Sequence, residues 1–285
     1  MFFIPTVISD PIGDLSGYPE GIVIPVDKPY RWTSADVIRK LKFAAIRHFR
    51  KKNLKVGHAG TLDPLATGVL LVCIGPACKK AQELQDHDKE YIARIRFGAT
   101  TPSYDLEKDV DRTFPFEHIT RAQVEAALPA FLGDQEQVAP LFSAKSVDGV
   151  RAYELARKLY RNGRVSELDA AALETLQRNK ITISELELLD FIPAGTASQS
   201  PVPEVSGTAS SRINVADTSA LGLPEAVIRI ACSKGTYIRA FARDLGEALG
   251  SGAHLSGLIR SRSGFFRVED ALSVDQALAL FQPGT

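Results

Sequence analysis

One glycine-rich stretch constrains this chain more than any other: GHAGTLDPLATG at 57–68, which continues into the apolar run VLLVCI at 69–74. Glycine lets the backbone turn sharply and lets another segment approach closely, because it has no Cβ. Asp63 lies between the glycines and precedes Pro64, and the residue before a proline is driven out of the helical region. We therefore expect a rigid, extended loop that presents Asp63 and leads into a buried strand.

The Asp63 carboxylate has two interpretations on local pattern. It is flanked by apolar Leu62 and Leu65. A half-buried charge is costly unless it is compensated, and carboxylates in such surroundings are frequently catalytic. The simpler alternative is an aspartate whose side chain caps a turn. The local pattern leaves both open.

Charge is balanced overall but uneven along the chain. Lysine plus arginine equals aspartate plus glutamate at 34 each, so the net charge does not point to a nucleic-acid partner. Between residues 28 and 55, however, a single acid, Asp36, faces ten basic residues. Such a run suits phosphate binding, although a solvated helix face is the ordinary alternative. The basic residues are Lys28, Arg31, Arg39, Lys40, Lys42, Arg47, Arg50, Lys51, Lys52 and Lys55.

The cysteines and the N-terminus exclude several classes of protein. Cys73, Cys78 and Cys232 neither form a disulfide framework nor have zinc-ligand spacing, and Cys73 reads as a small core residue. The N-terminus lacks a basic leader and is interrupted by Pro5, and no segment is long enough for a membrane span. We expect a cytoplasmic protein without metal.

The chain of 285 residues, 45% of them hydrophobic, suits one large domain or two small ones. Residues 1–19 read as an N-terminal extension, 20–270 as the main domain, and 271–285 as a short C-terminal helix and tail. Within the main domain, 193–224 is rich in Ala, Ser, Thr, Pro and Gly and reads as a low-complexity insertion.

Hydrophobic periodicity predicts a mixed α/β (α+β) fold with a large, mixed, mainly antiparallel sheet and flanking helices. Capping boxes at Thr33 and Thr120, and a cap at Ser273, predict three helix starts. The expected strands are 21–27, 69–74, 90–98, 180–191, 226–232 and 264–268. The other expected helices are 76–87, 149–161, 238–249 and 254–260.

The stretch at 57–68 resembles the signature of the TruB family of tRNA pseudouridine synthases. Further matching blocks follow in the same order, and together they span most of residues 20–270. The blocks are DKP at 27–29, KEY at 89–91, SAK at 143–145, YELAR at 153–157, CSKGTYIR at 232–239 and DLGEALGSGAH at 244–254. The resemblance implies the pseudouridine synthase fold with an active-site cleft across the sheet, and we expect no full PUA domain after the catalytic domain.

The resemblance also implies catalytic roles for three residues. Asp63 is the nucleophile, Arg239 is its ion partner, and Tyr91 stacks on the extruded base and takes part in proton transfer. Without the motif, Arg239 reads as a helix-surface residue and Tyr91 as core.

Four further positions match substrate-binding residues of the family. His58 fills the gap left in the RNA stack, Tyr237 lines the pocket and Leu258 addresses the uracil edge. Lys28 lies near the cleft, where a phosphate contact and a solvated lysine are both credible. By pattern alone His58 is a weak metal or acid–base candidate, and Tyr237 and Leu258 read as core.

Two blocks depart from the family pattern. TPSYD at 101–105 replaces a Thr-Asp-Thr-x-Asp turn that ends in glycine, and SAKS at 143–146 shifts the lysine of SALK by one residue. Neither departure touches the three catalytic positions.

The resemblance implies a monomeric isomerase that needs no cofactor and no protein partner. It flips the T-loop uridine out of the T-arm of tRNA and converts it to pseudouridine, with Asp63 attacking either C1′ or C6. The alternative is a non-catalytic tRNA-binding or folding chaperone of the same fold. A phosphate-transfer enzyme or hydrolase is disfavoured, because the chain has neither a GxxxxGK[ST] loop nor a GxSxG or HExxH motif.

Overall fold

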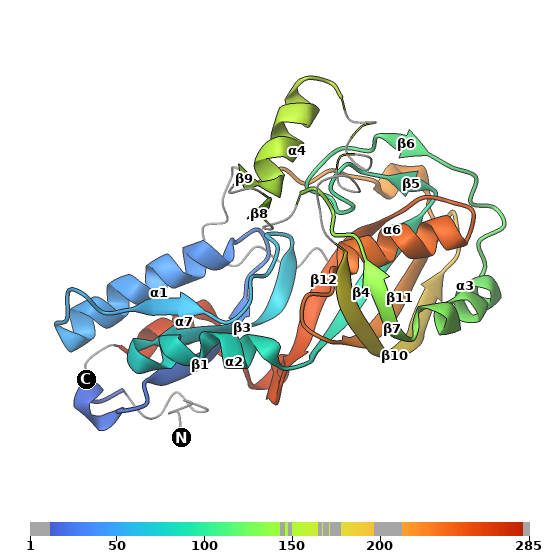
Figure 1. Cartoon of the computed structure of the whole chain (residues 1–285). Helices are drawn as coiled ribbons and strands as arrows, with labels where there is room; N and C mark the ends of the chain where they lie inside the picture. Colours follow the sequence, from blue (N-terminus) through green and yellow to red (C-terminus); the bar gives the residue numbers. More distant parts are fainter. Residues whose placement is uncertain are drawn as a thin grey trace. The chain divides into compact units, whose positions relative to one another are not determined.

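The computed structural model describes residues 12–142, 146–147, 150–164, 167, 171, 178–196 and 213–281. They form two compact units, one from residues 12–90 and 259–281, the other from the described residues of 91–196 and 213–258. The division falls within strands β4 (Lys89–Phe97) and β12 (Ala253–Ser263), so each of these strands has residues in both units (Figure 1).

The sheet of the first unit is built around β3 (Ala66–Ile74). Strand β1 (Ile22–Lys28) pairs with it antiparallel along its whole length, from Ile22 opposite Ile74 to Lys28 opposite Gly68. Strand β2 (Val56–His58) pairs antiparallel with its C-terminal end, and β12 is its other neighbour in the strand order. The apolar run at 69–74 is therefore a central, buried strand, as expected.

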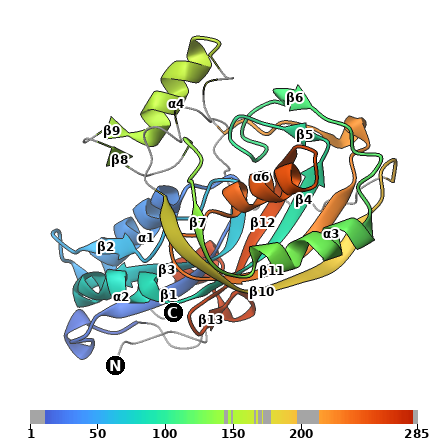
Figure 2. The same ribbon diagram turned by 45° about the vertical axis from the view of Figure 1, so that its right-hand side comes forward.

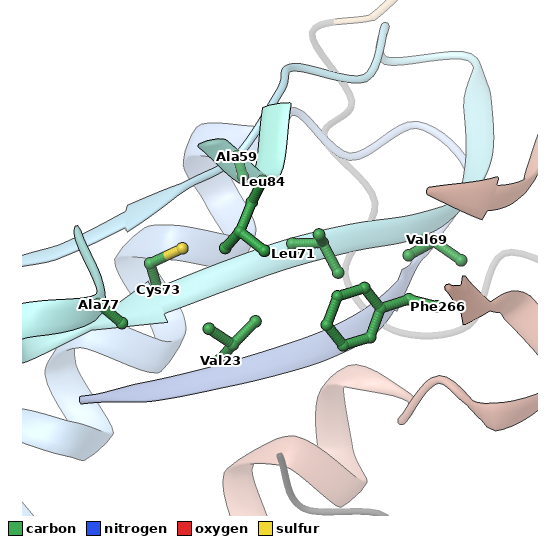
Figure 3. Close-up of a cluster of buried hydrophobic side chains, with 8 residues drawn as sticks. All are labelled: Val23, Ala59, Val69, Leu71, Cys73, Ala77, Leu84 and Phe266. Atoms are coloured by element: carbon green, nitrogen blue, oxygen red, sulfur yellow. The ribbon is translucent and has the colours of Figure 1, made fainter. Parts of the chain in front are cut away.

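Alternate side chains of β3 form one hydrophobic cluster of the first unit (Figure 3). Val69, Leu71 and Cys73 lie together on this side of β3, which confirms Cys73 as a core residue. Burying an aliphatic side chain of this kind contributes roughly 1.5–3 kcal/mol. Their partners are Val23 of β1, Ala59, Ala77 of η2 (Gly75–Lys80), Leu84 of α2 (Ala81–Asp86) and Phe266 of β13 (Phe266–Arg267).

Helix α1 (Ser34–Phe49) begins at the expected capping box of Thr33 and Asp36 and buries Val37, Leu41 and Ala45. Helix α7 (Val274–Ala279) begins at its cap, Ser273, as expected. The first unit also contains the short helices η1 (Leu15–Gly17) and η6 (Val268–Asp270).

The second unit contains the strand order β12-β4-β11-β10-β7. Strand β10 (Asn179–Ile192) pairs antiparallel with both β11 (Glu225–Cys232) and β7 (Gly133–Gln137). In β4, Tyr91, Ala93, Ile95 and Phe97 are buried, which confirms the expected alternation. The small pairs β5 (Ala99–Thr100) with β6 (Arg112–Thr113), and β8 (Ser146–Val147) with β9 (Val150–Arg151), lie outside this sheet.

Helices α3, α4 and α6 belong to the second unit (Figure 2). Helix α3 (Arg121–Ala127) begins at the expected capping box of Thr120 and Gln123 and leads into η3 (Leu128–Phe131). Helix α4 (Ala152–Arg161) packs with Val138, Ala139 and Leu141 in a separate cluster. Helix α6 (Ile238–Ala248) matches the expected helix at 238–249, and η5 (Ser219–Leu221) is a short turn.

Three expected elements are corrected. The strand expected at 264–268 is reduced to β13 (Phe266–Arg267), because residues 264–265 form a turn and Val268 begins η6. Residues 254–260 are part of strand β12 and not a helix: Gly257 disfavours a helix, and pairing in the sheet overrides the weak helical pattern. The helix expected at 149–161 begins at Ala152, because residues 150–151 form β9. SAK at 143–145 and residues 197–212 of the expected insertion lie outside the described residues. Within the described part of the chain, every helix is too short or too polar to cross a membrane.

Candidate active site

Asp63 lies half-buried on the loop between β2 and β3. Gly60 in this loop and Gly68 near the start of β3 have φ angles of 95° and 99°, values that side-chain-bearing residues rarely adopt. Leu62 and Leu65 are buried on either side of Asp63. The expected glycine-hinged loop with apolar flanks is therefore confirmed.

Five consecutive carbonyls of this loop, from residue 60 to residue 64, accept hydrogen bonds. Such bonds hold an irregular segment in place, whereas the backbone groups of an exposed loop can bond to water instead. The donors are Arg260 to Gly60 (3.2 Å) and Thr61 (3.4 Å), Ser34 Oγ to Leu62 (3.2 Å), the Ala66 amide to Asp63 (3.1 Å) and Lys28 Nζ to Pro64 (3.2 Å). The backbone that presents Asp63 is consequently fixed on both sides.

Lys28 is fully buried at the end of β1. Its Nζ donates to the carbonyls of Trp32 (2.6 Å), Pro29 (3.0 Å) and Pro64 (3.2 Å). Desolvation lowers the pKa of Lys28 to about 7, although the Asp63 and Asp27 carboxylates act in the opposite direction. The solvated lysine considered from sequence is therefore wrong. The three carbonyls match the three protons of the ammonium, which leaves none for a phosphate.

His58 lies half-buried on β2, five residues before Asp63. Its Nδ1 is buried without a hydrogen-bond partner among the described residues. Burial, followed by the nearby charge of Arg260, lowers its pKa, so the ring is neutral at neutral pH. In the described part of the chain no cluster of three or more His, Cys, Asp or Glu could hold a metal ion, so His58 has no co-ligands there.

The basic run at 28–55 forms an exposed surface on α1 and the turn that follows it. Eight of its ten basic residues are exposed, Arg31 is intermediate and Lys28 is buried. We call this set the basic surface: Arg39, Lys40, Lys42, Arg47, Arg50, Lys51, Lys52 and Lys55.

Arg239 is buried in the first turn of α6, so the helix-surface alternative is wrong. Its guanidinium donates to the carbonyls of Ser103 (3.1 Å) and Phe142 (2.9 Å), and its Nε lies 3.8 Å from the Asp105 carboxylate. Arg239 belongs to the second unit and Asp63 to the first, and their pairing stays a prediction.

Asp105 was not singled out from the sequence. It is buried, and its carboxylate accepts from Ser103 Oγ (2.6 Å) and the Glu107 amide (2.9 Å) as well as facing Arg239. Tyr104 before it has a left-handed φ of 56°, which is strained for a residue with a side chain. The available signal was the Ser-x-Asp pattern in TPSYD, which is typical of a turn closed by side-chain oxygens.

The remaining expected site residues lie in the second unit. Tyr91 is buried on β4, and Leu258 is half-buried on β12. Tyr237 is half-buried at the N-cap of α6, where its backbone exchanges two hydrogen bonds with the Gln137 side chain, and its ring packs against the cluster around α4. Their contacts with a substrate stay predictions.

Comparison with solved structures defines the class of fold. A Cbf5–Nop10–Gar1 complex contains a chain that matches with a TM-score of 0.55 at 22% identity, covering 96% of this chain and 65% of that one. The archaeal box H/ACA sRNP Nop10–Cbf5 complex matches with a TM-score of 0.54 at 22% identity, covering 92% and 54%. This chain thus spans between half and two thirds of those longer chains, and it shares the pseudouridine synthase fold.

Sequence comparison defines the family. The family model for the N-terminal domain of TruB family pseudouridylate synthases matches residues 47–208. The tRNA pseudouridine synthase B of Phocaeicola vulgatus is 50% identical over 258 residues, which cover 90% of this chain and 92% of the relative. That of Thermus thermophilus is 41% identical, covering 87% and 75%. The chain belongs to the TruB family.

Proposed function

We propose that this chain is a tRNA pseudouridine synthase, an isomerase that converts the T-loop uridine of tRNA to pseudouridine. Family membership and relatives named tRNA pseudouridine synthase B support this activity. The observation that carries the proposal is Asp63 itself. At the position of the family nucleophile the chain presents a half-buried carboxylate on a loop whose carbonyls at 60–64 are all hydrogen-bonded.

The reaction rearranges bonds within one nucleoside. The N1–C1′ bond breaks, the base rotates and a C5–C1′ bond forms, while C5 loses a proton and N1 gains one. Neither an oxidant nor an external group is required, so we expect no cofactor. Asp63 attacks C1′ or C6, and the covalent intermediate divides one hard step into easier ones.

Arg239 is the ion partner of Asp63 in this proposal, and its planar guanidinium suits a carboxylate. Its own orientation is set by the carbonyls of Ser103 and Phe142 and by Asp105. Tyr91 stacks on the extruded base and takes part in removing the C5 proton, while Tyr237 and Leu258 complete the pocket. His58, neutral and half-buried, fills the gap in the RNA stack.

The basic surface contacts the phosphates of the T-arm. Lys28 acts by holding Pro64 rather than by touching RNA, because its ammonium is buried on three carbonyls. We further propose that residues 20–270 form the catalytic domain, and that the enzyme is a cytoplasmic monomer.

Asp63→Asn tests the proposal. The purified chain is incubated with a T-arm stem-loop transcript and no cofactor, and pseudouridine is mapped chemically or by mass spectrometry. The parent should modify the T-loop uridine, and the variant should bind the transcript with a similar dissociation constant but make no product. Product formation by Asp63→Asn removes Asp63 from the nucleophile role.

The basic surface also suits a second function, a tRNA-folding chaperone that needs RNA contacts but no carboxylate. In that case the parent would bind the stem-loop and accelerate its folding without forming pseudouridine, and Asp63→Asn would behave as the parent does. The two functions are therefore separated by one product assay.

A further inference from the structure

Arg260 on β12 is one of the largest fully buried side chains of the chain. Its guanidinium donates only to backbone carbonyls: Nε to Val69 (2.7 Å) and the two terminal nitrogens to Gly60 (3.2 Å) and Thr61 (3.4 Å). Among the described residues no carboxylate lies within ion-pair distance of it. A charge buried without an ion pair is costly, and an apolar side chain of similar size could fill the same space at less cost.

The Asp63 loop is the segment 59–65 between β2 and β3. The three acceptors of Arg260 lie on both sides of Asp63, in this loop and in β3, and we call these two sides its two arms. Gly60 and Thr61 precede Asp63, whereas Val69 follows it in β3. A single planar guanidinium with donors in a fixed fork therefore ties the two arms together, which a lysine ammonium or an apolar side chain cannot reproduce.

Gly68 shows how closely β3, the strand that follows the Asp63 loop, and its sheet neighbour β12 approach each other. A Cβ on Gly68 would lie 2.3 Å from the Arg260 carbonyl oxygen and 2.8 Å from its nitrogen. The backbone of Arg260 thus packs against β3 just after the loop, while its side chain reaches Gly60 and Thr61 before Asp63.

The positive charge of Arg260 also affects the pKa of two residues near Asp63. It lowers the pKa of both His58 and Lys28, and Lys28 in turn is close enough to Asp63 for that carboxylate to raise the lysine pKa. The Arg260 guanidinium and the Lys28 side-chain nitrogen therefore support the same loop from β12 and β1.

We propose that Arg260 is a positioning residue for catalysis: it clamps both arms of the Asp63 loop and supplies a fixed positive charge beneath it. This inference rests on the proposed role of Asp63. Arg260 acts through the loop and needs no contact with substrate, so its removal should slow the chemical step without weakening RNA binding.

Arg260→Met, Arg260→Lys and the control Arg262→Met test this inference. Arg262 is two residues further along β12 and donates to the Gly264 carbonyl (2.9 Å), outside the Asp63 loop. Single-turnover rates at saturating T-arm transcript and dissociation constants are measured for each. Arg260→Met should lower the rate by roughly 100-fold, as expected for a misplaced catalytic group, with an unchanged dissociation constant. Arg260→Lys should recover part of the rate, because the charge remains, and Arg262→Met should match the parent.

Each other result has a defined meaning. If the parent makes pseudouridine and Arg260→Met retains its rate, the inference is overturned and the proposed function stands. Equal losses in rate and RNA affinity, or failure of both Arg260 variants to give a cooperative melting transition, assign Arg260 a general structural role and overturn it as well. If the parent makes no pseudouridine, the proposed function itself fails.

Discussion

Replacing Lys28 with methionine should change how the stability of the chain depends on pH. In the folded chain the pKa of Lys28 is about 7, whereas its ordinary value of 10.5 applies once the chain unfolds. Between these two pH values the unfolded chain binds one more proton at Lys28 than the folded chain does. Raising the pH therefore favours the folded state, and lowering it favours unfolding.

The magnitude follows from the size of this pKa difference. One proton of difference corresponds to about 1.4 kcal/mol of unfolding free energy per pH unit. Between pH 7 and pH 9 the parent should gain about 2 kcal/mol relative to Lys28→Met, after allowing for partial protonation of the folded chain near pH 7. Lys28 is fully buried, so solvent screening does not reduce this figure.

Urea unfolding at pH 7, 8 and 9 measures the effect. The unfolding free energy of the parent should rise relative to that of Lys28→Met, while Lys52→Met, which alters an exposed lysine of the basic surface, should run parallel to the parent. Parallel curves for the parent and Lys28→Met would show that Lys28 keeps its ordinary pKa in the folded chain, and the reasoning from its burial would be refuted.

Three further predictions concern other parts of the chain. Gly68→Ala should lower the unfolding free energy by about 2–5 kcal/mol, since the φ of Gly68 is 99° and a Cβ there would lie 2.3 Å from a backbone oxygen. In the same urea titration the control Gly57→Ala should cost under about 1 kcal/mol, because a Cβ at Gly57 would have no other atom within 4 Å. His254 is fully buried, and desolvation lowers its pKa to about 4. As the pH falls from 6.5 to 4, the unfolded chain binds a proton at His254 before the folded chain does, so the parent should lose up to about 3 kcal/mol of unfolding free energy relative to His254→Gln. Equal acid sensitivity of the two proteins would contradict this. Changing Lys51, Lys52 and Lys55 to glutamine should weaken T-arm binding and reduce the slope of log K against log salt by up to about 3, and an unchanged slope would show that these lysines do not contact phosphates.

Elements defined by local pattern were predictable from the sequence. The capping boxes at Thr33 and Thr120 have both of their reciprocal hydrogen bonds, and the alternation of β4 gives the expected buried face. These features depend on residues three or four positions apart, or two apart, along one segment. The sharp course of the loop around Asp63 likewise follows from its glycines and Pro64, although residues 64–65 form a turn and are not extended as expected.

Features that depend on distant segments were not predictable. The Arg260 side chain contacts Val69, 191 residues away, and Arg239 contacts Ser103, 136 residues away. No local pattern encodes such pairings, so Lys28 could be read as solvated and Asp105 could pass unnoticed. The strand at 253–263 was read in part as a helix for the same reason, because its neighbours in the sheet and not its own residues decide its conformation.

The hydrogen bonds that hold the backbone of the Asp63 loop do not involve the Asp63 carboxylate, so the position of the loop and the charge of the side chain can be changed separately. The donors, Lys28, Ser34, Ala66 and Arg260, all belong to the first unit, and they bond backbone carbonyls rather than the Asp63 carboxylate. Asp63→Asn changes only the side chain, so these bonds should persist and the loop should keep its shape. Arg260→Met does the reverse, since it leaves the carboxylate in place and releases the backbone. Loss of activity in both variants with RNA affinity retained would therefore show that catalysis needs both the charge and its fixed position.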